Sequence, residues 1–272
     1  VLPALDRAAA LEVTSVHSVA GVLPPSCPLV TRPPFRDPHH TTSVSALVGG
    51  GSGMARPGQA SLAHHGVLFL DEAPEFASGV LDALRQPLES GHVTIARSGG
   101  VAHYPARFLL VLAANPCGCA TAGSPDSCTC SPLVRRRYLS RLSGPLLDRV
   151  DLQVRMDRVS RAELFADRAG VESSEVVAKR VLAARERAVA RFAGLPWRTN
   201  SEVPGRELRD RWAPARSAMV AAERALDAGR LSPRGLDRVL RVAWTLADLA
   251  GRPCPGAGEI DEALYLRTGV AA

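Results

Sequence analysis

The sequence has few aromatic residues and no long apolar run. Phe, Trp and Tyr make up 4% of its 272 residues, so it lacks the aromatic side chains that stack on bases in many single-strand-binding domains. Its longest uninterrupted apolar run, Phe108 to Ala114, is far too short to cross a bilayer. Residues 1–6 carry neither the basic segment nor the apolar core of a signal peptide. We therefore expect a soluble, cytoplasmic protein with no membrane partner.

Cysteine and lysine are also scarce. Six cysteines in this length do not form a disulfide scaffold. Lys179 is the single lysine, so nearly all positive charge is arginine. Residues 155–241 carry 19 basic and 12 acidic side chains, whereas residues 1–154 carry 12 and 11. A basic second half is compatible with a polyanionic partner, and a set of solvated helix faces is the simpler explanation.

Two short apolar runs predict neighbouring strands of a parallel sheet. Gly66–Leu70 and Phe108–Ala114 are apolar at every position, which is typical of strands buried on both faces. Between them the sequence predicts a helix over residues 78–91 and a hairpin over residues 93–104 that turns at Gly99 and Gly100. Strand, helix, hairpin and strand in this order indicate an α/β fold.

The rest of the chain is loop-rich before the first strand and helical after residue 155. The many prolines and glycines of residues 21–66 predict loops, and we expect residues 49–55 to be a flexible turn. Apolar residues at helical spacing predict three later helices, with an irregular linker over residues 196–214. These helices cover residues 175–192, 216–227 and 235–249.

Two carboxylates end the first predicted strand. Asp71 and Glu72 follow Gly66–Leu70 directly, at the edge where parallel sheets place their ligands. An apolar run followed by Asp-Glu is the Walker B pattern of ATPases, in which the Asp holds Mg²⁺ and the Glu polarises the attacking water. A strand that leaves the core into a charged turn produces the same pattern without catalysis, so this alternative stays open.

Three further polar residues suit the same chemistry. Asn115 ends the second predicted strand, where an amide would orient water at the γ-phosphate of ATP; a simple Asn-Pro turn is the alternative. Arg149 would stabilise transition-state charge in a neighbouring subunit, and Arg234, at the start of a predicted helix, would contact the γ-phosphate. Taken singly, each arginine is more often a surface residue.

Four cysteines cluster on the loop after Asn115. They form two C-x-C pairs separated by eight residues, Cys117 with Cys119 and Cys128 with Cys130. Two such pairs suit a tetrahedral Zn²⁺ site; free thiols or a redox disulfide are the alternatives. The double histidines at residues 39–40 and 64–65 are poorly arranged to share an ion, because neighbours on a strand point to opposite faces. We expect them to form hydrogen bonds instead.

Four sequence blocks stand out together: PFRDPHH from Pro34, HGVLFLDE from His65, LRQPLESG from Leu84 and SGPLLDRVD from Ser143. In this order and spacing they resemble the magnesium-chelatase-like AAA+ proteins of bacteria, the YifB/ComM family. The resemblance covers nearly the whole chain. It implies a P-loop-type parallel-sheet core with a helix-2 insert, a pre-sensor hairpin and the Cys-rich loop over residues 1–155, followed by an all-helical lid over residues 156–272.

The resemblance also implies roles for single residues. They are Walker B for Asp71 and Glu72, sensor 1 for Asn115, arginine finger for Arg149, sensor 2 for Arg234, and a pore-facing DNA contact for Arg97 and His103 on the hairpin. The implied cofactors are ATP and Mg²⁺, and the implied assembly is a ring, a hexamer. Its implied work is DNA remodelling, by branch migration or helicase action, in recombination or natural transformation.

One family element has no match. The Walker A loop, G-x-x-x-x-G-K-[ST], precedes the segment that resembles Leu2–Gly21 in the family, and Gly49–Gly53 lacks its Lys-Ser/Thr. We therefore expect the chain to be the C-terminal part of a longer ATPase and inactive by itself. Two alternatives remain: a non-catalytic fragment for DNA binding or assembly, and a chelatase-type motor that acts on a partner protein.

Overall fold

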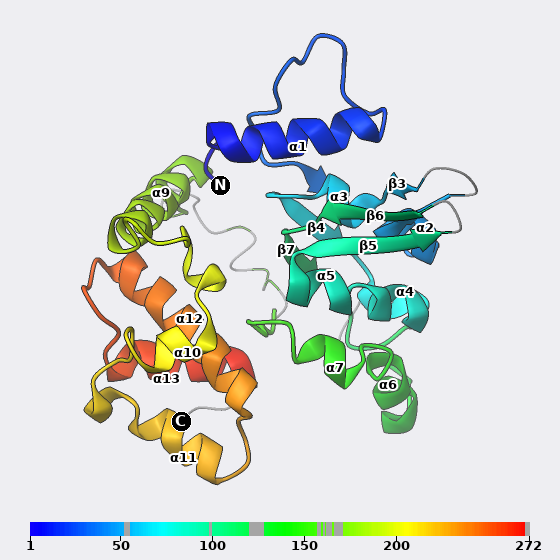
Figure 1. The fold of residues 1–272 in the computed structure, drawn as a ribbon. Helices are drawn as coiled ribbons and strands as arrows, with labels where there is room; N and C mark the ends of the chain where they lie inside the picture. Colours follow the sequence, from blue (N-terminus) through cyan, green and yellow to red (C-terminus); the bar gives the residue numbers. More distant parts are fainter. Residues whose placement is uncertain are drawn as a thin grey trace. The chain divides into compact units, whose positions relative to one another are not determined.

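The chain divides into two compact units. The computed structural model describes residues 1–51, 55–97, 100–119, 128–156, 159, 161, 165 and 171–269. One unit, here the α/β unit, is Ala4–Val150; the other, the helical unit, is Asp151–Ala272 with Val1–Pro3 (Figure 1). No described helix is both long and apolar enough to span a membrane.

A three-stranded parallel sheet forms the centre of the α/β unit. Its order is β1 (Phe35–Arg36), β4 (Val67–Leu70) and β7 (Leu109–Leu112). Val67 lies opposite Leu109 and Leu70 opposite Leu112. The two predicted strands are therefore confirmed as parallel neighbours, and the short strand β1 arises inside a region where the sequence indicated only loops.

The two faces of this sheet differ in burial. Leu68 and Leu70 are fully buried and belong to the same core cluster as Phe76. On the other face, Phe35 is 59% exposed and Leu109 is 54% exposed. The prediction that these strands are buried on both faces is thus wrong for one face, because alternate residues of a strand point to opposite sides.

The predicted helix after β4 is broken into two. A 3₁₀ turn, η1 (Ala73–Glu75), leads to α4 (Ser78–Ala83) and α5 (Arg85–Ser90). Pro87 has no N–H to donate to the carbonyl four residues earlier, which explains the break at Leu84. Gly91 ends α5 in the left-handed region, φ 71°, as an αL cap.

Two antiparallel ladders complete the strands of the α/β unit. The predicted hairpin is confirmed as β5 (His92–Arg97) paired with β6 (Gly100–Pro105). Of the two predicted turn residues, Gly99 lies outside the described residues, and Gly100 instead begins β6, opposite Arg97. Residues 49–50 form β2 and pair with β3, Arg56–Pro57. Both glycines of β2 are buried, so the prediction of a flexible turn is wrong for them, and residues 52–54 of that predicted turn lie outside the described residues. A Cβ on Gly49 would lie 2.7 Å from both the Arg56 carbonyl oxygen and Ile95 Cδ1, so this glycine permits close packing.

The described residues of the α/β unit form five more helices. They are α1 (Arg7–Val19), α2 (Val44–Val48), α3 (Gln59–Leu62), α6 (Pro132–Leu139) and α7 (Gly144–Leu147). Side-chain N-caps begin several of them: Asp6 caps α1, and Ser131 caps α6 ahead of a proline at its first position. The helix α6 follows the Cys-rich loop directly, so its cap fixes where that loop ends.

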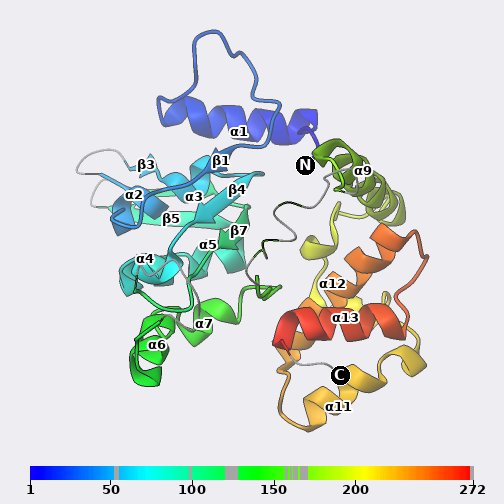
Figure 2. The ribbon, with the colours of Figure 1, turned by 180° about the vertical axis from the view of Figure 1, so that it is seen from behind.

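The helical unit is built around α12 (Pro233–Ala250). This helix packs on α13 (Ala257–Thr268) and on α9 (Ser174–Arg191), and α12 lies beside α13 in both views (Figures 1 and 2). The three predicted helices are confirmed, the middle one as a 3₁₀ turn followed by α11 (Val220–Asp227). The predicted linker is only partly irregular, because it contains α10 (Gly205–Arg209) and a 3₁₀ turn before it.

Candidate functional site

The Asp-Glu pair lies at the carboxyl edge of the parallel sheet. Both side chains are exposed where β4 ends, and Asp71 Oδ1 accepts a 2.9 Å hydrogen bond from the Glu72 N–H. Glu72 has φ 49°, in the left-handed region that non-glycine residues seldom adopt. Such a conformation costs on the order of 1–3 kcal/mol and is concentrated at functional sites. The backbone therefore turns sharply to present both carboxylates to solvent.

Glu72 has a histidine neighbour from the adjacent strand. His40 follows β1, and its Nδ1 lies 3.3 Å from Glu72 Oε2. The His40 ring packs against the His39 ring at 4.1 Å between centroids and meets Phe76 edge-on. The expected hydrogen-bonding role is confirmed for His39, whose Nδ1 lies 3.0 Å from Thr41 Oγ1, whereas the contact of His40 with Glu72 was not predicted. Only the parallel pairing of β1 with β4 could have indicated it.

Asn115 lies at the same edge of the sheet. The backbone ladder continues beyond β7, since the Ala113 N–H donates to the Leu70 carbonyl at 3.0 Å and the Ala73 N–H donates to the Ala113 carbonyl at 2.8 Å. Asn115 comes two residues later and is exposed. The structure therefore brings the predicted Walker B and sensor 1 residues to one edge.

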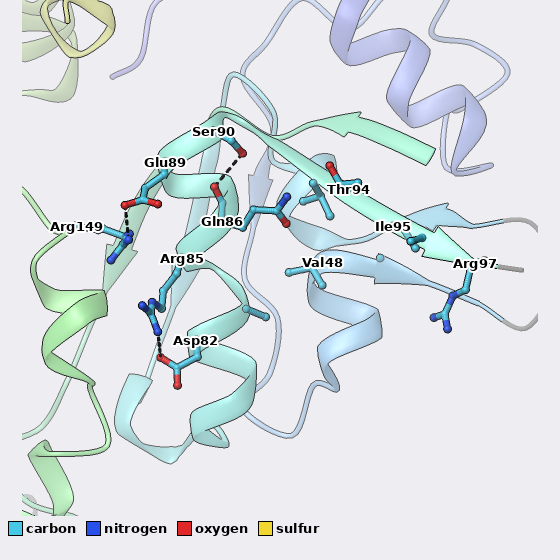
Figure 3. Close-up of a pocket in the computed structure, with 14 residues that line it drawn as sticks. Val48, Asp82, Arg85, Gln86, Glu89, Ser90, Thr94, Ile95, Arg97 and Arg149 are labelled. Carbon is cyan, nitrogen blue, oxygen red and sulfur yellow. Dashed lines mark hydrogen bonds and ion pairs between the residues drawn. The ribbon is translucent and has the colours of Figure 1, made fainter. Parts of the chain in front are cut away.

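Arg149 is held inside its own unit. Its guanidinium forms an ion pair with Glu89 of α5, and its side chain is only 10% exposed. The two residues line one end of a pocket of about 700 Å³, and Arg97 lies at the other end (Figure 3). A role as an arginine finger remains a prediction for this residue.

The two hairpin residues expected to contact DNA face opposite sides. His103 pairs with Thr94, and its Nδ1 lies 3.0 Å from Thr94 Oγ1. Residues paired across the hairpin share a face, and successive residues along a strand alternate between faces. Arg97 therefore lies on the same face as the buried Ile95, whereas His103, paired with Thr94, lies on the opposite, outer face. The prediction of DNA contacts at both residues therefore does not describe one surface.

Arg234 lies in the first turn of α12, in the helical unit, and is exposed. The predicted helix start is confirmed, with Ser232 as the N-cap one residue before Pro233. Its predicted contact with a nucleotide remains a prediction.

The four clustered cysteines converge. Their sulfur atoms all lie within 4.8 Å of one another, and Cys117 Sγ is 2.8 Å from Cys119 Sγ and 3.2 Å from Cys128 Sγ. No disulfide joins any two of the four. The pKa of Cys117 is raised to about 12, chiefly because hydrogen bonds with Cys119 and then Cys128 favour its protonated form. Four sulfur donors at this spacing are a ligand set for a soft or borderline metal ion.

A second cluster joins Glu12 of α1 to the residues before β4. Glu12 Oε2 lies 2.9 Å from His64 Nε2 and 3.0 Å from His65 Nε2. The Arg107 N–H donates to His64 Nδ1 at 3.0 Å, so the bonding network assigns the His64 proton to Nε2, which donates to Glu12. Because that nitrogen has no free lone pair, the cluster is a hydrogen-bonded clasp, as expected for this double histidine, rather than a metal site.

Two family models match the chain. "Magnesium chelatase, subunit ChlI" covers residues 1–164, and "Magnesium chelatase, subunit ChlI C-terminal" covers residues 171–267. An uncharacterized protein of Mycobacterium tuberculosis is 57% identical over 98% of this chain and 52% of its own length. The competence protein ComM of Haemophilus influenzae is 42% identical over 86% of this chain and 45% of its own length. YifB of Escherichia coli is 41% identical over 91% of this chain and 48% of its own length.

The chain thus spans about half the length of the curated relatives it matches. The matched regions include both units, and the parallel α/β unit followed by a helical unit agrees with the fold that the sequence blocks imply. The chain belongs to the magnesium-chelatase-like AAA+ family that includes YifB and ComM.

Proposed function

We propose that the chain supplies the Walker B, sensor and lid parts of an ATP-hydrolysing motor. The observation that carries this proposal is the meeting of Asp71, Glu72 and Asn115 at one edge of a parallel sheet. Membership of an AAA+ family supports it. An acidic pair and an amide at this edge are the groups that a nucleotide, its ion and an attacking water require.

The residues at the sheet edge fit a Mg²⁺–ATP complex. Asp71 offers an exposed carboxylate, the hard oxygen donor that Mg²⁺ prefers, and this residue would hold the ion. When bound, the ion neutralises charge on the phosphate oxygens. Glu72 would orient and deprotonate the attacking water, with His40 fixing the direction of its carboxylate. Asn115 would hold that water in line with the γ-phosphate.

In the proposed ring, a hexamer, two arginines would complete each ATP site, one from the same subunit and one from its neighbour. Arg234 would approach the γ-phosphate from the helical lid of the same subunit. Arg149 would serve the nucleotide of the neighbouring subunit and would have to exchange its ion pair with Glu89 for a phosphate.

The work of the motor would be DNA remodelling, such as branch migration or helicase action. The similarity to a competence protein and the arginine-rich helical unit support this part of the proposal. On the hairpin, His103 would contact DNA from the face opposite the buried Ile95, and Arg97, which lines the pocket, would do so from the other face.

Two other functions have some support. A chelatase-type motor, which acts on a partner protein, is favoured by the match to the ChlI models. A non-catalytic DNA-binding or assembly role is supported by residues 155–241, which carry 19 basic and 12 acidic side chains.

ATP hydrolysis by a form of the chain extended at its N-terminus to include a Walker A loop tests the proposal. We expect turnover that branched DNA stimulates and that Glu72→Gln abolishes. Glu262→Gln, the same change at an exposed position of α13, should leave turnover unchanged. DNA binding without turnover would favour the non-catalytic role, and turnover that DNA does not stimulate would favour a protein partner.

A further inference from the structure

We infer that Cys117, Cys119, Cys128 and Cys130 bind one Zn²⁺, and that this centre positions the Asn115 loop against the segment that carries Glu72. The metal site stands on the cysteines alone. The positioning role rests on the proposed ATPase function.

The donor set suits Zn²⁺ in number, type and spacing. A tetrahedral Zn²⁺ with Zn–S bonds of about 2.3 Å holds its sulfurs about 3.8 Å apart. The four sulfurs here lie within 4.8 Å of one another, and Cys119 Sγ is 3.4 Å from Cys128 Sγ across the two pairs. Small outward movements would place all four on one ion. The four sulfurs converge on a single point and no disulfide joins either pair, which distinguishes this cluster from two disulfides.

The centre would join two functional segments. Cys117 follows Asn115 by two residues, at the end of the ladder that extends β7. Cys130 immediately precedes Ser131, whose Oγ accepts the N-cap hydrogen bond of α6. One ion would therefore tie the predicted sensor 1 loop to the start of α6.

The same loop packs directly on α6. A Cβ on Gly118 would lie 3.1 Å from two ring carbons of Tyr138 and 3.4 Å from Glu75 Oε1. Tyr138 is buried, at 8% exposure. Gly118 thus lets the backbone between the first two cysteines lie close against a buried aromatic ring, and a Cβ there would require the loop or the ring to shift by a few tenths of an ångström.

Just after α6, two residues beyond its end at Leu139, Arg141 makes contacts that lead back to the Walker B segment. Arg141 donates to the Pro74 carbonyl and to Glu75 Oε2, both at 3.0 Å. Glu75 belongs to η1, and its N–H donates to the Glu72 carbonyl at 2.7 Å. A continuous series of contacts therefore runs from the cysteines to Glu72. Asn115 is held by the strand ladder on one side and by the cysteine centre on the other.

The metal content of the 272-residue chain, purified without oxygen, tests the site. We expect about one Zn²⁺ per chain by elemental analysis, with four sulfur ligands in the X-ray absorption spectrum. Cys128→Ser should lose most of the zinc. Cys254→Ser, a change at an exposed cysteine outside the cluster, should keep it. A wild-type chain without zinc, or with cysteines 117–130 recovered as disulfides, would overturn the site.

Gly118→Ala tests positioning because it keeps all four cysteines but requires the loop or the Tyr138 ring to shift by a few tenths of an ångström. In the N-terminally extended form we expect full zinc, nearly unchanged KM for ATP, and kcat lower by about 10- to 100-fold. Gly144→Ala is the matched control, since a Cβ there meets no atom within 4 Å. Unchanged kcat in both Gly118→Ala and Cys128→Ser would overturn positioning. An inactive extended wild type that holds zinc would instead overturn the proposed ATPase and, with it, the positioning role, while leaving the metal site standing.

Discussion

Single side chains in this protein are held by neighbours far away in the sequence. His64 is 1% exposed and bonds Glu12, which lies 52 residues earlier. Burial lowers the pKa of His64 to about 4, despite the opposing effect of Glu12, and the hydrogen bond from His64 lowers the pKa of Glu12. The imidazole is therefore neutral in the folded protein over the physiological range.

This clasp predicts a loss of stability in mild acid. Unfolded histidine has a pKa near 6.5, so between about pH 6.5 and 4 the unfolded chain binds a proton that folded His64 does not. The free energy of unfolding should fall across this window as pH decreases, by up to about 3 kcal/mol from this residue. Glu12 adds a loss in the same direction below its unfolded pKa of 4.5. Urea denaturation at several pH values measures both.

A paired substitution isolates the histidine. His64→Gln should flatten the pH dependence between pH 6.5 and 4, whereas the same change at His39, which is exposed, should leave it as in the wild type. Equal slopes in all three proteins would contradict the assignment.

At the scale of single elements, close backbone approaches decide which strands can pair. Gly66 precedes β4, and a Cβ there would lie 1.9 Å from the Pro34 carbonyl oxygen. That carbonyl accepts the Val67 N–H bond that joins β1 to β4, at 2.8 Å. A side chain at residue 66 would force β1 away from the sheet.

Two glycine substitutions should therefore have opposite effects. Gly66→Ala should destabilise the chain by about 1–3 kcal/mol or more, since backbone must move. Gly79→Ala in α4 should stabilise it by about 0.5–1 kcal/mol, because a Cβ there meets nothing within 4 Å and alanine favours the helix. Denaturant midpoints of the two variants give the comparison. Similar midpoints would mean that the β1–β4 approach does not limit stability.

At the scale of the whole molecule, the proposed ring predicts that two inactive variants complement each other, which a site within one subunit would not allow. If Arg149 serves a neighbour's nucleotide while Glu72 serves its own, Arg149→Ala and Glu72→Gln should each abolish turnover alone, by about a thousandfold for the arginine. A mixture of the two variants should recover activity, up to about one quarter of wild type in equal proportion, because an interface then can receive both intact residues. Mixtures that stay inactive, although they assemble, would place both residues in one subunit's site.

Control rings of Glu89→Gln separate this role from a local one. Glu89→Gln removes the ion pair but leaves Arg149 in place, so turnover should persist if Arg149 acts on the neighbour's nucleotide. If Arg149 serves only to form that ion pair, Glu89→Gln should reduce turnover as much as Arg149→Ala does. Turnover is measured in the N-terminally extended form for all of these proteins.

Local patterns were enough to determine most of the elements. The apolar runs, the hairpin and the capped helices follow from periodicity and end signals within a few residues, so β4, β7, β5–β6, α9 and α12 were predicted from the sequence. The Asp-Glu pair and the C-x-C pairs are also local patterns. The strand order predicted that Asp71 and Glu72 share a sheet edge with Asn115, and the spacing of the cysteines predicted that the four cluster together.

Only the tertiary structure decided the relations between distant segments. A two-residue strand such as β1 has no periodicity, so its pairing with β4, and hence the contact between His40 and Glu72, depends on packing. The open apolar face of the sheet, the pairing of Arg149 with Glu89 and the contact of Gly118 with Tyr138 have the same origin. Each of these contacts joins residues that become neighbours only when helices and strands pack together. Local periodicity in the sequence carries no information on that packing.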